Sequence, residues 1–471
     1  MIRLSRLMEL LAKQSIAGAN ERLGLSAFGT CRLFRDRFAS SLDPAVTLGF
    51  VPGRVEVAGK HTDYAGGHTL VCAIDKGFLF VAGANSSGAI RIVEDSLEFD
   101  SVEFPFTASI EPPLGRWENY PMTIAKRVAA NFSGDGALNG LDIAFTSDLP
   151  VGSGMSGSSA LMMMCFCAIA MVNKIQERSA FKENIHNGID LAMYLACAEN
   201  GQSFRNLQGG RGVGTFGGSE DHTAILNCRE GYLSLYQYAP MVFKAEGAWP
   251  SQWALVVAFS GMRAEKTREA LEKYNFASKR ASRAVQTYNH IYRKKLQTLS
   301  EIDMQTRGTA TASWLKRLEG RKPEEKALDL PGRVRQFLME ERESTPRALE
   351  AILWRDLDAF GAAVNASHRA SRRLLRNIAP EIDFLQRSAG KLGAAGATGF
   401  GAGFGGSAFA VIRTEDAVQF ASAWPKEYLR RYAEREKESA FFLSKPSSGI
   451  RIWDENGQSR FVDTLLYAPT P

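Results

Sequence analysis

The first concentration of reactive side chains lies in the segment GRVEVAGKHTDYAGGH. Its polar and charged residues, which suit hydrogen bonding to a polyol, are Arg54, Lys60, His61, Asp63 and Tyr64. The segment looks like a phosphate-binding P-loop, but its spacing between Gly53 and Gly59 is one residue too long, and His61 stands where that motif has serine or threonine. We therefore predict a polyol-binding turn, with a surface hairpin as the alternative.

A second glycine-rich segment, PVGSGMSGSSA from Pro150 to Ala160, leads directly into a long apolar stretch that predicts a buried helix. Glycines let successive backbone N–H groups point toward one ligand, and a helix N-terminus attracts anions. The hydroxyls of Ser156, Ser158 and Ser159 add donors, and one of them could bind Mg²⁺. This context favours a phosphate site over a flexible connector.

The third segment, GATGFGAGFGGSAFAV, contains a GxGxxG match at Gly401, Gly403 and Gly406. A dinucleotide site needs a strand before this motif and a helix after it, whereas here a strand follows. The pattern predicts instead a glycine-rich hairpin that packs closely against a ligand or another part of the backbone.

Composition narrows the class of protein. The chain has 471 residues, is 45% hydrophobic and carries a mixed net charge of +6, which is typical of a globular protein of two to three domains. The absence of a long basic run disfavours nucleic acid as a partner. None of the six cysteines has zinc-site spacing, so we expect free thiols, a reducing compartment and a cytoplasmic location. The longest apolar run, 161–172, is too short to cross a membrane.

Hydrophobic periodicity predicts the elements that must hold these segments. Residues 1–20 predict an amphipathic helix rather than a signal peptide. Further helices are expected at 21–43, 117–132, 160–172, 187–200, 347–376, 380–393 and 415–435. Strands are expected at 69–110, 140–149, 224–238, 253–259, 408–412 and 439–453.

In this order and spacing, the three segments resemble the three motifs of the GHMP kinase superfamily, and within it those of galactokinase. Shorter pieces agree in order: WENY at 117–120, AEN at 198–200, YNFASKRAS at 274–282 and FGAAVNASH at 360–368. The resemblance covers residues 20–460 and implies an α+β, two-domain GHMP-kinase-like fold with the active site in the interdomain cleft. We place the domains at 1–245 and 246–471, the second with a charged helical insertion around 284–345.

The resemblance implies an ATP-dependent kinase, with Mg²⁺ as cofactor, that phosphorylates the anomeric hydroxyl of galactose or a related sugar. Arg54 matches the arginine near the transferring phosphoryl group, and Asp221 matches the catalytic aspartate, which accepts the anomeric proton or orients the hydroxyl. The positions that match sugar contacts are Lys60, His61, Asp63, Gly218 and Tyr274. The expected ATP contacts are Pro150, Gly152, Ser153, Gly154, Ser156, Gly157, Ser158 and Ser159, and the expected Mg²⁺ ligands are Ser158 and Glu199.

Several positions depart from the family pattern. Lys60 replaces a glutamate near the 6-hydroxyl of the sugar, and because an ammonium attracts carboxylates, an acidic sugar such as galacturonate is a second hypothesis. Alternatively, Lys60 turns away or pairs with Glu56 or Glu220, which also depart from the pattern. Gly157 replaces a loop serine, and His222 stands where the family usually has glutamine.

Two other functions remain as alternatives. A GHMP enzyme that acts on a non-sugar alcohol is disfavoured by the HTDY sequence at 61–64, which is typical of the sugar kinases. A catalytically silent sugar sensor would have no need to keep Arg54, Asp221, Ser158 and Glu199 together. The sequence leaves both a monomer and a homodimer open.

Overall fold

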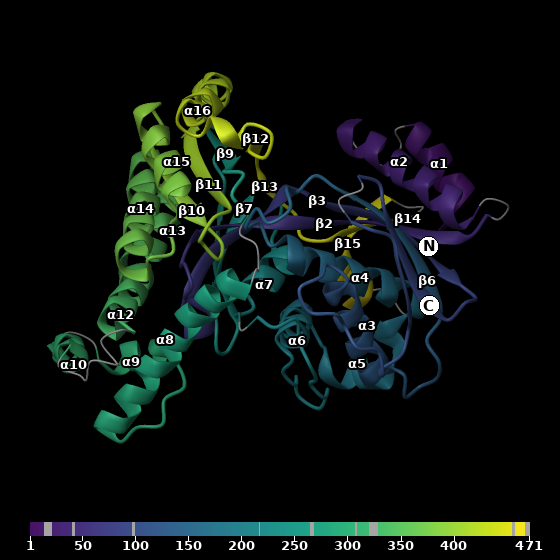
Figure 1. The fold of residues 1–471 in the computed structure, drawn as a ribbon, viewed down its shortest axis with the longest axis horizontal. Coiled ribbons are helices and arrows are strands. Elements are labelled where there is room, and N and C mark those ends of the chain that lie inside the picture. The colour runs from purple at the N-terminus through teal and green to yellow at the C-terminus, as the bar shows by residue number, and fades with distance from the viewer. Residues whose placement is uncertain are drawn as a thin grey trace.

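The computed structural model describes residues 1–13, 21–39, 43–96, 99–215, 217–263, 268–306, 309–319, 328–454 and 457–466. Within these ranges the strands form one large sheet and one smaller sheet, and helices pack against both (Figure 1). This mixture confirms the predicted α+β class. None of the helices in these ranges combines the length and the apolar character needed to cross a membrane.

The large sheet has the order β15-β14-β2-β3-β6-β4-β5, with β1 paired to β2, β13 and β7 paired to β3, and β8 paired to β7. Its strands are β1 (Ile2–Arg3), β2 (Ala45–Ala58), β3 (His68–Asn85), β4 (Ala89–Glu94), β5 (Val102–Pro105), β6 (Gly140–Ser147), β7 (Tyr232–Gln237), β8 (Val242–Ala248), β13 (Pro446–Ser447), β14 (Arg451–Asp454) and β15 (Gly457–Arg460). Strand β2 is buried from its second residue onward, which explains its continuous apolar character. Register shifts between Pro52 and Arg54 and between Glu56 and Ala58 interrupt its pairing with β3 and redirect the side chains there.

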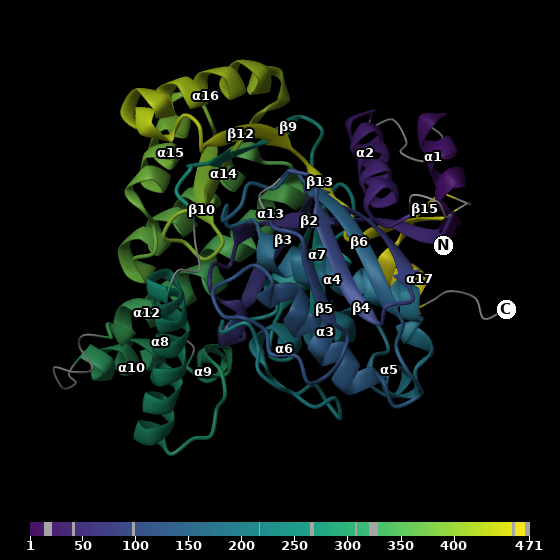
Figure 2. The ribbon, with the colours of Figure 1, turned by 45° about the vertical axis from the view of Figure 1, so that its right-hand side comes forward.

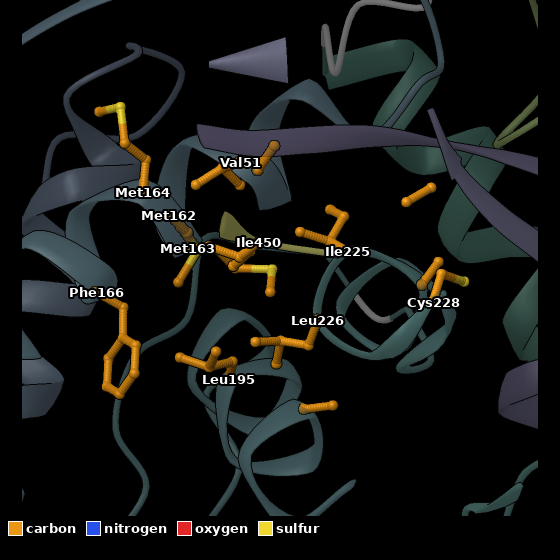
Figure 3. Close-up of a cluster of buried hydrophobic side chains, with 14 of the residues drawn as sticks. Val51, Met162, Met163, Met164, Phe166, Leu195, Ile225, Leu226, Cys228 and Ile450 are labelled. Carbon is orange, nitrogen blue, oxygen red and sulfur yellow. The ribbon is translucent and has the colours of Figure 1, made fainter. Parts of the chain in front are cut away.

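Helices cover the large sheet. They are α1 (Leu4–Ala12), α2 (Glu21–Phe38), α3 (Asn119–Phe132), α4 (Gly157–Asn173), α5 (Ser179–Asn184), α6 (Gly188–Asn200), α7 (Glu220–Asn227) and α17 (Phe461–Leu466). Helix α4 is buried without interruption from Ser159 to Ala170, which confirms the predicted buried helix. Met162, Met163, Met164 and Phe166 belong to one buried cluster with Leu195, Leu226 and Ile450 from three other segments (Figure 3).

The small sheet has the order β10-β11-β9-β12. Its strands are β9 (Trp253–Phe259), β10 (Gly396–Phe400), β11 (Ser407–Arg413) and β12 (Ala440–Ser444), and the helices around it are α14 (Leu357–Ala370), α15 (Pro380–Lys391) and α16 (Ala417–Arg431). Helix α13 (Thr345–Trp354) packs against α14 and against β3 and β8 of the large sheet. A further group of helices, at the lower left of Figure 1, comprises α8 (Arg268–Tyr292), α9 (Leu299–Gln305), α10 (Thr309–Glu319), α12 (Leu330–Met339) and a π-helical turn, η3 (Glu340–Ser344). In the turned view of Figure 2 these helices remain separate from α1 and α2.

Three predicted elements differ in the structure. Residues 224–227, predicted as strand, belong to helix α7, whose acidic residues Glu220 and Asp221 occupy the first turn, where the helix dipole favours them. The predicted helix 347–376 is divided by the left-handed backbone of Arg355. The predicted closing strand 439–453 is three strands, and those after Lys445 return to the large sheet.

Candidate active site

The three glycine-rich segments, far apart in the sequence, meet in space. Ser407 Oγ donates to Ser153 O (2.7 Å), and the Gly401 N–H donates to Glu56 Oε2 (3.0 Å). A Cβ on Gly401 would lie 2.4 Å from Gly154 O, so this close approach requires glycine. The predicted glycine-rich hairpin is confirmed, because β10 and β11 pair in antiparallel register around it.

The second segment joins β6 to the N-terminus of α4. Gly152, Gly154 and Ser156 adopt positive φ angles of 69°, 75° and 62°, which shape the loop ahead of the helix. Ser156 Oγ is buried and has no hydrogen-bond partner among the residues that the structure describes. A helix N-terminus next to an unsatisfied hydroxyl suits a phosphate group. Of the expected ATP contacts, Pro150, Gly152, Ser153, Gly154 and Ser156 lie in this loop, and Gly157, Ser158 and Ser159 lie in the first turn of α4.

Arg54 connects this loop to Asp221. Its Nη1 donates to Gly154 O (2.7 Å), while its Nε and Nη2 lie 2.9 and 2.8 Å from Asp221 Oδ1. Burial lowers the pKa of Arg54, but the charges of Asp221, Glu220 and Glu56 raise it by more, so the guanidinium stays charged. Asp221 is 32% exposed at its side chain, which leaves it accessible to a substrate hydroxyl.

Glu199 of α6 lies next to the same group. Ser159 Oγ donates to Glu199 Oε2 (2.8 Å) and lies 3.5 Å from Asp221 Oδ2. His222 Nε2 is 3.1 Å from Glu199 Oε2. In the described part of the chain, no three His, Cys, Asp or Glu side chains are placed to hold a metal by themselves. Carboxylate and hydroxyl oxygens with phosphate oxygens suit Mg²⁺, so Glu199 with Ser158 or its neighbour Ser159 fits a metal–nucleotide site.

Asp63 and Gly218, predicted from different segments, lie side by side, since a Cβ on Gly218 would lie 2.0 Å from Asp63 Oδ2. Asp63 accepts the Tyr64 N–H (2.8 Å) and the Glu220 N–H (3.4 Å). Burial raises the pKa of Asp63 to about 6, and the nearby charges of Asp221 and Glu56 add to the rise. The pKa of this carboxyl therefore lies well above the usual range of an aspartate.

His61 lies beside Asp63 on the turn that joins β2 to β3. Its Nδ1 is 2.8 Å from the Tyr64 hydroxyl, and its Nε2 is 3.2 Å from Ala402 O of the third glycine-rich segment. Burial lowers the pKa of His61 to about 4, so the imidazole is neutral at physiological pH. The side chain of Tyr274 on α8 falls outside the described residues, so its sugar contact stays a prediction.

Lys60 is buried, with 1% of its surface exposed, and its Nζ has no hydrogen-bond partner among the described residues. Together with Asn377 and the hairpin glycines it borders a gap that is too small to hold a water molecule. The carboxylate of Glu56, one of the expected partners, instead accepts the N–H groups of His61 (3.3 Å) and Gly401 (3.0 Å). The other expected partner, Glu220, lies against Arg54.

The structure also brings in residues that the sequence did not indicate. Glu340 of η3 accepts the Gly59 N–H (3.0 Å) and the Ser367 hydroxyl (2.6 Å). Asn377 Nδ2 lies 3.3 Å from His61 Nε2. Glu340 and Asn377 lie about three hundred residues along the chain from the turn that they contact, and no pattern in the sequence indicates these contacts. By contrast, the two-residue strand period could have placed Glu56 on the same side of β2 as Arg54.

Replacing Gly218 by alanine is expected to lower kcat/KM for the sugar by about 10²-fold, because small displacements of a positioned group have effects of that size. A Cβ at this position would lie 2.0 Å from Asp63 Oδ2, so the carboxylate must move. Steady-state kinetics on both substrates measures this, and KM for ATP should change little. Gly210→Ala is the matched control, since a Cβ there meets nothing within 4 Å. Equal kinetics for the two variants would contradict the expectation.

Sugar affinity is expected to increase as the pH rises through about 6, because Asp63 must lose its proton to act as a full hydrogen-bond acceptor. Neutral His61, with its pKa of about 4, does not titrate in this range. Calorimetry measures sugar affinity from one pH unit below to one unit above the pKa of Asp63. Leaving nucleotide out avoids a contribution from the protonation of ATP. An affinity that is constant across the range would contradict this assignment.

Comparisons with known proteins agree with this geometry. Residues 32–84 match the family model of the galactokinase galactose-binding signature, residues 119–199 that of the GHMP kinase N-terminal domain, and residues 348–430 that of the GHMP kinase C-terminal region. The segment 284–345 lies outside all three ranges.

Similar proteins are found over most of the chain. A galactokinase of Lacticaseibacillus paracasei is 26% identical over 413 residues, which cover 85% of this chain and 94% of that protein. A galactokinase of Exiguobacterium sibiricum is 28% identical over 385 residues, covering 79% and 86%. The structure of Lactococcus lactis galactokinase complexed with galactose has a TM-score of 0.69 at 21% identity, covers 89% of this chain and 97% of that one, and so supports the fold.

Proposed function

Because the chain belongs to the GHMP kinase superfamily and is a galactokinase-like sugar kinase, we propose that it transfers the γ-phosphate of ATP to the anomeric hydroxyl of a sugar. The observation that carries this proposal is the position of Arg54, which contacts both the glycine-rich loop at Gly154 and the carboxylate of Asp221. A permanent cation between a phosphate loop and a candidate base is suited to phosphoryl transfer.

In this mechanism the sugar binds through Asp63 and His61, with the anomeric hydroxyl at Asp221. Asp221 accepts the hydroxyl proton or orients the hydroxyl, while Arg54 holds the carboxylate in place and stabilises the charge that develops on the phosphoryl group. The loop at 150–159 and the N-terminus of α4 bind the triphosphate. Glu199 and Ser158 are the proposed ligands of Mg²⁺, which supplies charge neutralisation on the phosphates when bound.

The proposal is tested by ADP release with Mg-ATP and a panel of hexoses, uronates and non-sugar alcohols. Turnover that depends on a sugar supports the kinase. Sugar binding without turnover on any member of the panel would instead support a silent sensor, and turnover limited to a non-sugar alcohol would overturn the sugar assignment.

An acidic sugar such as galacturonate is the second candidate substrate, because the buried Lys60 ammonium has no hydrogen-bond partner among the described residues. Burial raises the pKa of the Glu340 carboxyl, and the charge of Lys60 already offsets part of that rise, but no described group accepts a hydrogen bond from the ammonium, and a substrate carboxylate would provide that acceptor. In the same panel, a higher kcat/KM for galacturonate than for galactose, lost in Lys60→Met, supports this candidate. A clear preference of the wild type for galactose rejects it.

We also propose a cytoplasmic location and a division of the chain into two domains just after β8 (Val242–Ala248), because the predicted boundary at 245 falls inside that paired strand. Support for the location comes from the six cysteines, which are all free and buried, as in proteins of reducing compartments. Limited proteolysis followed by mass spectrometry tests the division, since cleavage should concentrate between the two predicted domains.

A further inference from the structure

One face of the α12–η3 segment lies along the predicted sugar-binding turn and bonds to its backbone. Arg333 Nη2 donates to His61 O (2.6 Å), Gln336 Nε2 donates to Lys60 O (2.8 Å), and Glu340 Oε2 accepts from the Gly59 N–H (3.0 Å). The residue numbers of the side chains rise along the helix (333, 336, 340), while those of the backbone groups that they contact fall along the turn (61, 60, 59). The two segments therefore run antiparallel, with one side-chain contact for each of three successive residues.

The π-helical turn extends this set of contacts. A π-helical turn changes the helical register, and such turns are frequent at functional sites. Next to Glu340, Glu341 also reaches the turn: its carboxylate accepts the His68 N–H (2.8 Å) and lies 2.6 Å from His68 Nδ1. The turn is thus held at both its beginning and its end.

These contacts are buried and mutually supported. Arg333, Gln336 and Glu340 have no exposed surface. Arg333 Nη1 also donates to Gln336 Oε1 (2.6 Å), which fixes the amide so that its nitrogen faces the Lys60 carbonyl. A buried backbone carbonyl that loses its donor costs more than the bond alone contributes, so each contact restricts the path of the turn.

The backbone conformation of the turn needs stabilising contacts because part of it is energetically unfavourable. His61 has a φ of 58°, in the left-handed region that non-glycine residues rarely adopt. The orientations of His61 and Asp63 depend on this backbone. An apolar core also joins the turn to the helices, with Ala65 packed among Leu299, Trp314 and Phe337.

We propose that Arg333, Gln336 and Glu340 are positioning residues for sugar binding, and that the helical segment 330–344 serves to hold the sugar-binding turn in its binding conformation. This inference rests on the proposed function. It assigns a role to part of the helical insertion, which the sequence did not link to the chemistry. The nucleotide loop makes no contact with these three side chains among the described hydrogen bonds, so the effect should be confined to the sugar.

The test is Gln336→Met, which keeps a similar volume and removes the donor to Lys60 O. We expect KM for the sugar that the wild type uses best to rise roughly tenfold, as for the loss of one buried hydrogen bond, with KM for ATP within a factor of about two. Gln336→Glu provides a second variant, because it can still accept from Arg333 but cannot donate to the carbonyl. Arg335→Met is the matched control: Arg335 lies on the exposed side of α12 and pairs with Glu319.

Calorimetric titration of the same sugar, without nucleotide, should show the same loss of affinity. If one of the folded Gln336 variants shows unchanged sugar KM and affinity, or a parallel rise in the KM values for sugar and ATP, the positioning role is wrong. If Gln336→Met does not fold, Gln336→Glu decides by the same criteria. If the wild type and Arg335→Met turn over no sugar at all, the proposed function fails, and this inference fails with it.

Discussion

Asp221→Asn is expected to lower kcat by about 10²–10⁴-fold, the usual contribution of a positioned acid or base. Asparagine retains an oxygen for Arg54, which now bonds to Asp221 Oδ1 through Nε and Nη2, so the loop and the guanidinium should stay in place. It cannot accept the anomeric proton. We therefore expect the KM values for sugar and ATP to change little, because the change affects the reacting hydroxyl rather than the binding groups.

Single-turnover kinetics with saturating sugar and Mg-ATP measures the chemical step directly. The control is Asp358→Asn, which makes the same chemical change at an exposed position in the first turn of α14. A reduction of less than about tenfold would mean that Asp221 only orients the hydroxyl, and that Arg54 and the metal supply most of the rate enhancement.

The site was predictable from the sequence to the extent that its residues lie within compact motifs. Lys60, His61 and Asp63 fall on one turn, and the ATP contacts fall on one loop and the first turn of the helix that follows it, so local chain geometry brings them together. The buried helix α4 was equally clear, because an apolar stretch of that length after a glycine loop has few other structures. That Arg54 and Asp221, 167 residues apart, belong to one site followed only from the family resemblance, and their direct contact was not predicted.

What could not be predicted depends on tertiary contacts. Residues 224–227 alternate too weakly to separate strand from helix, and the structure places them in α7 because Glu220 and Asp221 begin that helix at the site. The contacts of Arg333, Gln336 and Glu340 join side chains to backbone groups more than 270 residues away, and a backbone donor or acceptor leaves no trace in the sequence. The return of β13–β15 to the large sheet is a similar long-range pairing.

The structure narrows the possible partners of the Lys60 ammonium. From the sequence, an ion pair with Glu56 or Glu220 was as reasonable as a substrate carboxylate. In the structure Glu56 is occupied by two backbone N–H groups and Glu220 lies 3.3 Å from Arg54 Nε. Neither carboxylate hydrogen-bonds to Lys60. Kinetics on the substrate panel therefore decides between galactose and an acidic sugar.

Arg54→Met is expected to have the largest combined effect on activity and stability. Removing an arginine that stabilises a transferring phosphoryl group lowers kcat by about 10³–10⁵-fold. The change also leaves Glu56, Glu220 and Asp221 without the cation that now offsets their charges. Loss of one partner from a buried ion pair costs about 3–5 kcal/mol in the free energy of unfolding.

The stability loss caused by Arg54→Met should depend on pH. Burial already raises the pKa of Glu220 well above its ordinary value, and the charge of Glu56 raises it further, while Arg54 lowers it. Without Arg54 the folded-state pKa of Glu220 rises again, so folding favours the protonated carboxyl more strongly. A group with a raised folded-state pKa stabilises the fold below its unfolded pKa and loses that contribution as the pH rises through the folded value. The unfolded-state pKa is the same in both proteins, so the difference in unfolding free energy between variant and wild type should increase only as the pH rises through the wild-type folded-state pKa of Glu220, which lies well above its ordinary value. Urea denaturation at several pH values measures this difference in unfolding free energy. Adding Glu220→Gln to Arg54→Met should recover part of the lost stability. A loss that is independent of pH and unaffected by the second change would show that Arg54 stabilises the fold through Gly154 and packing rather than through charge.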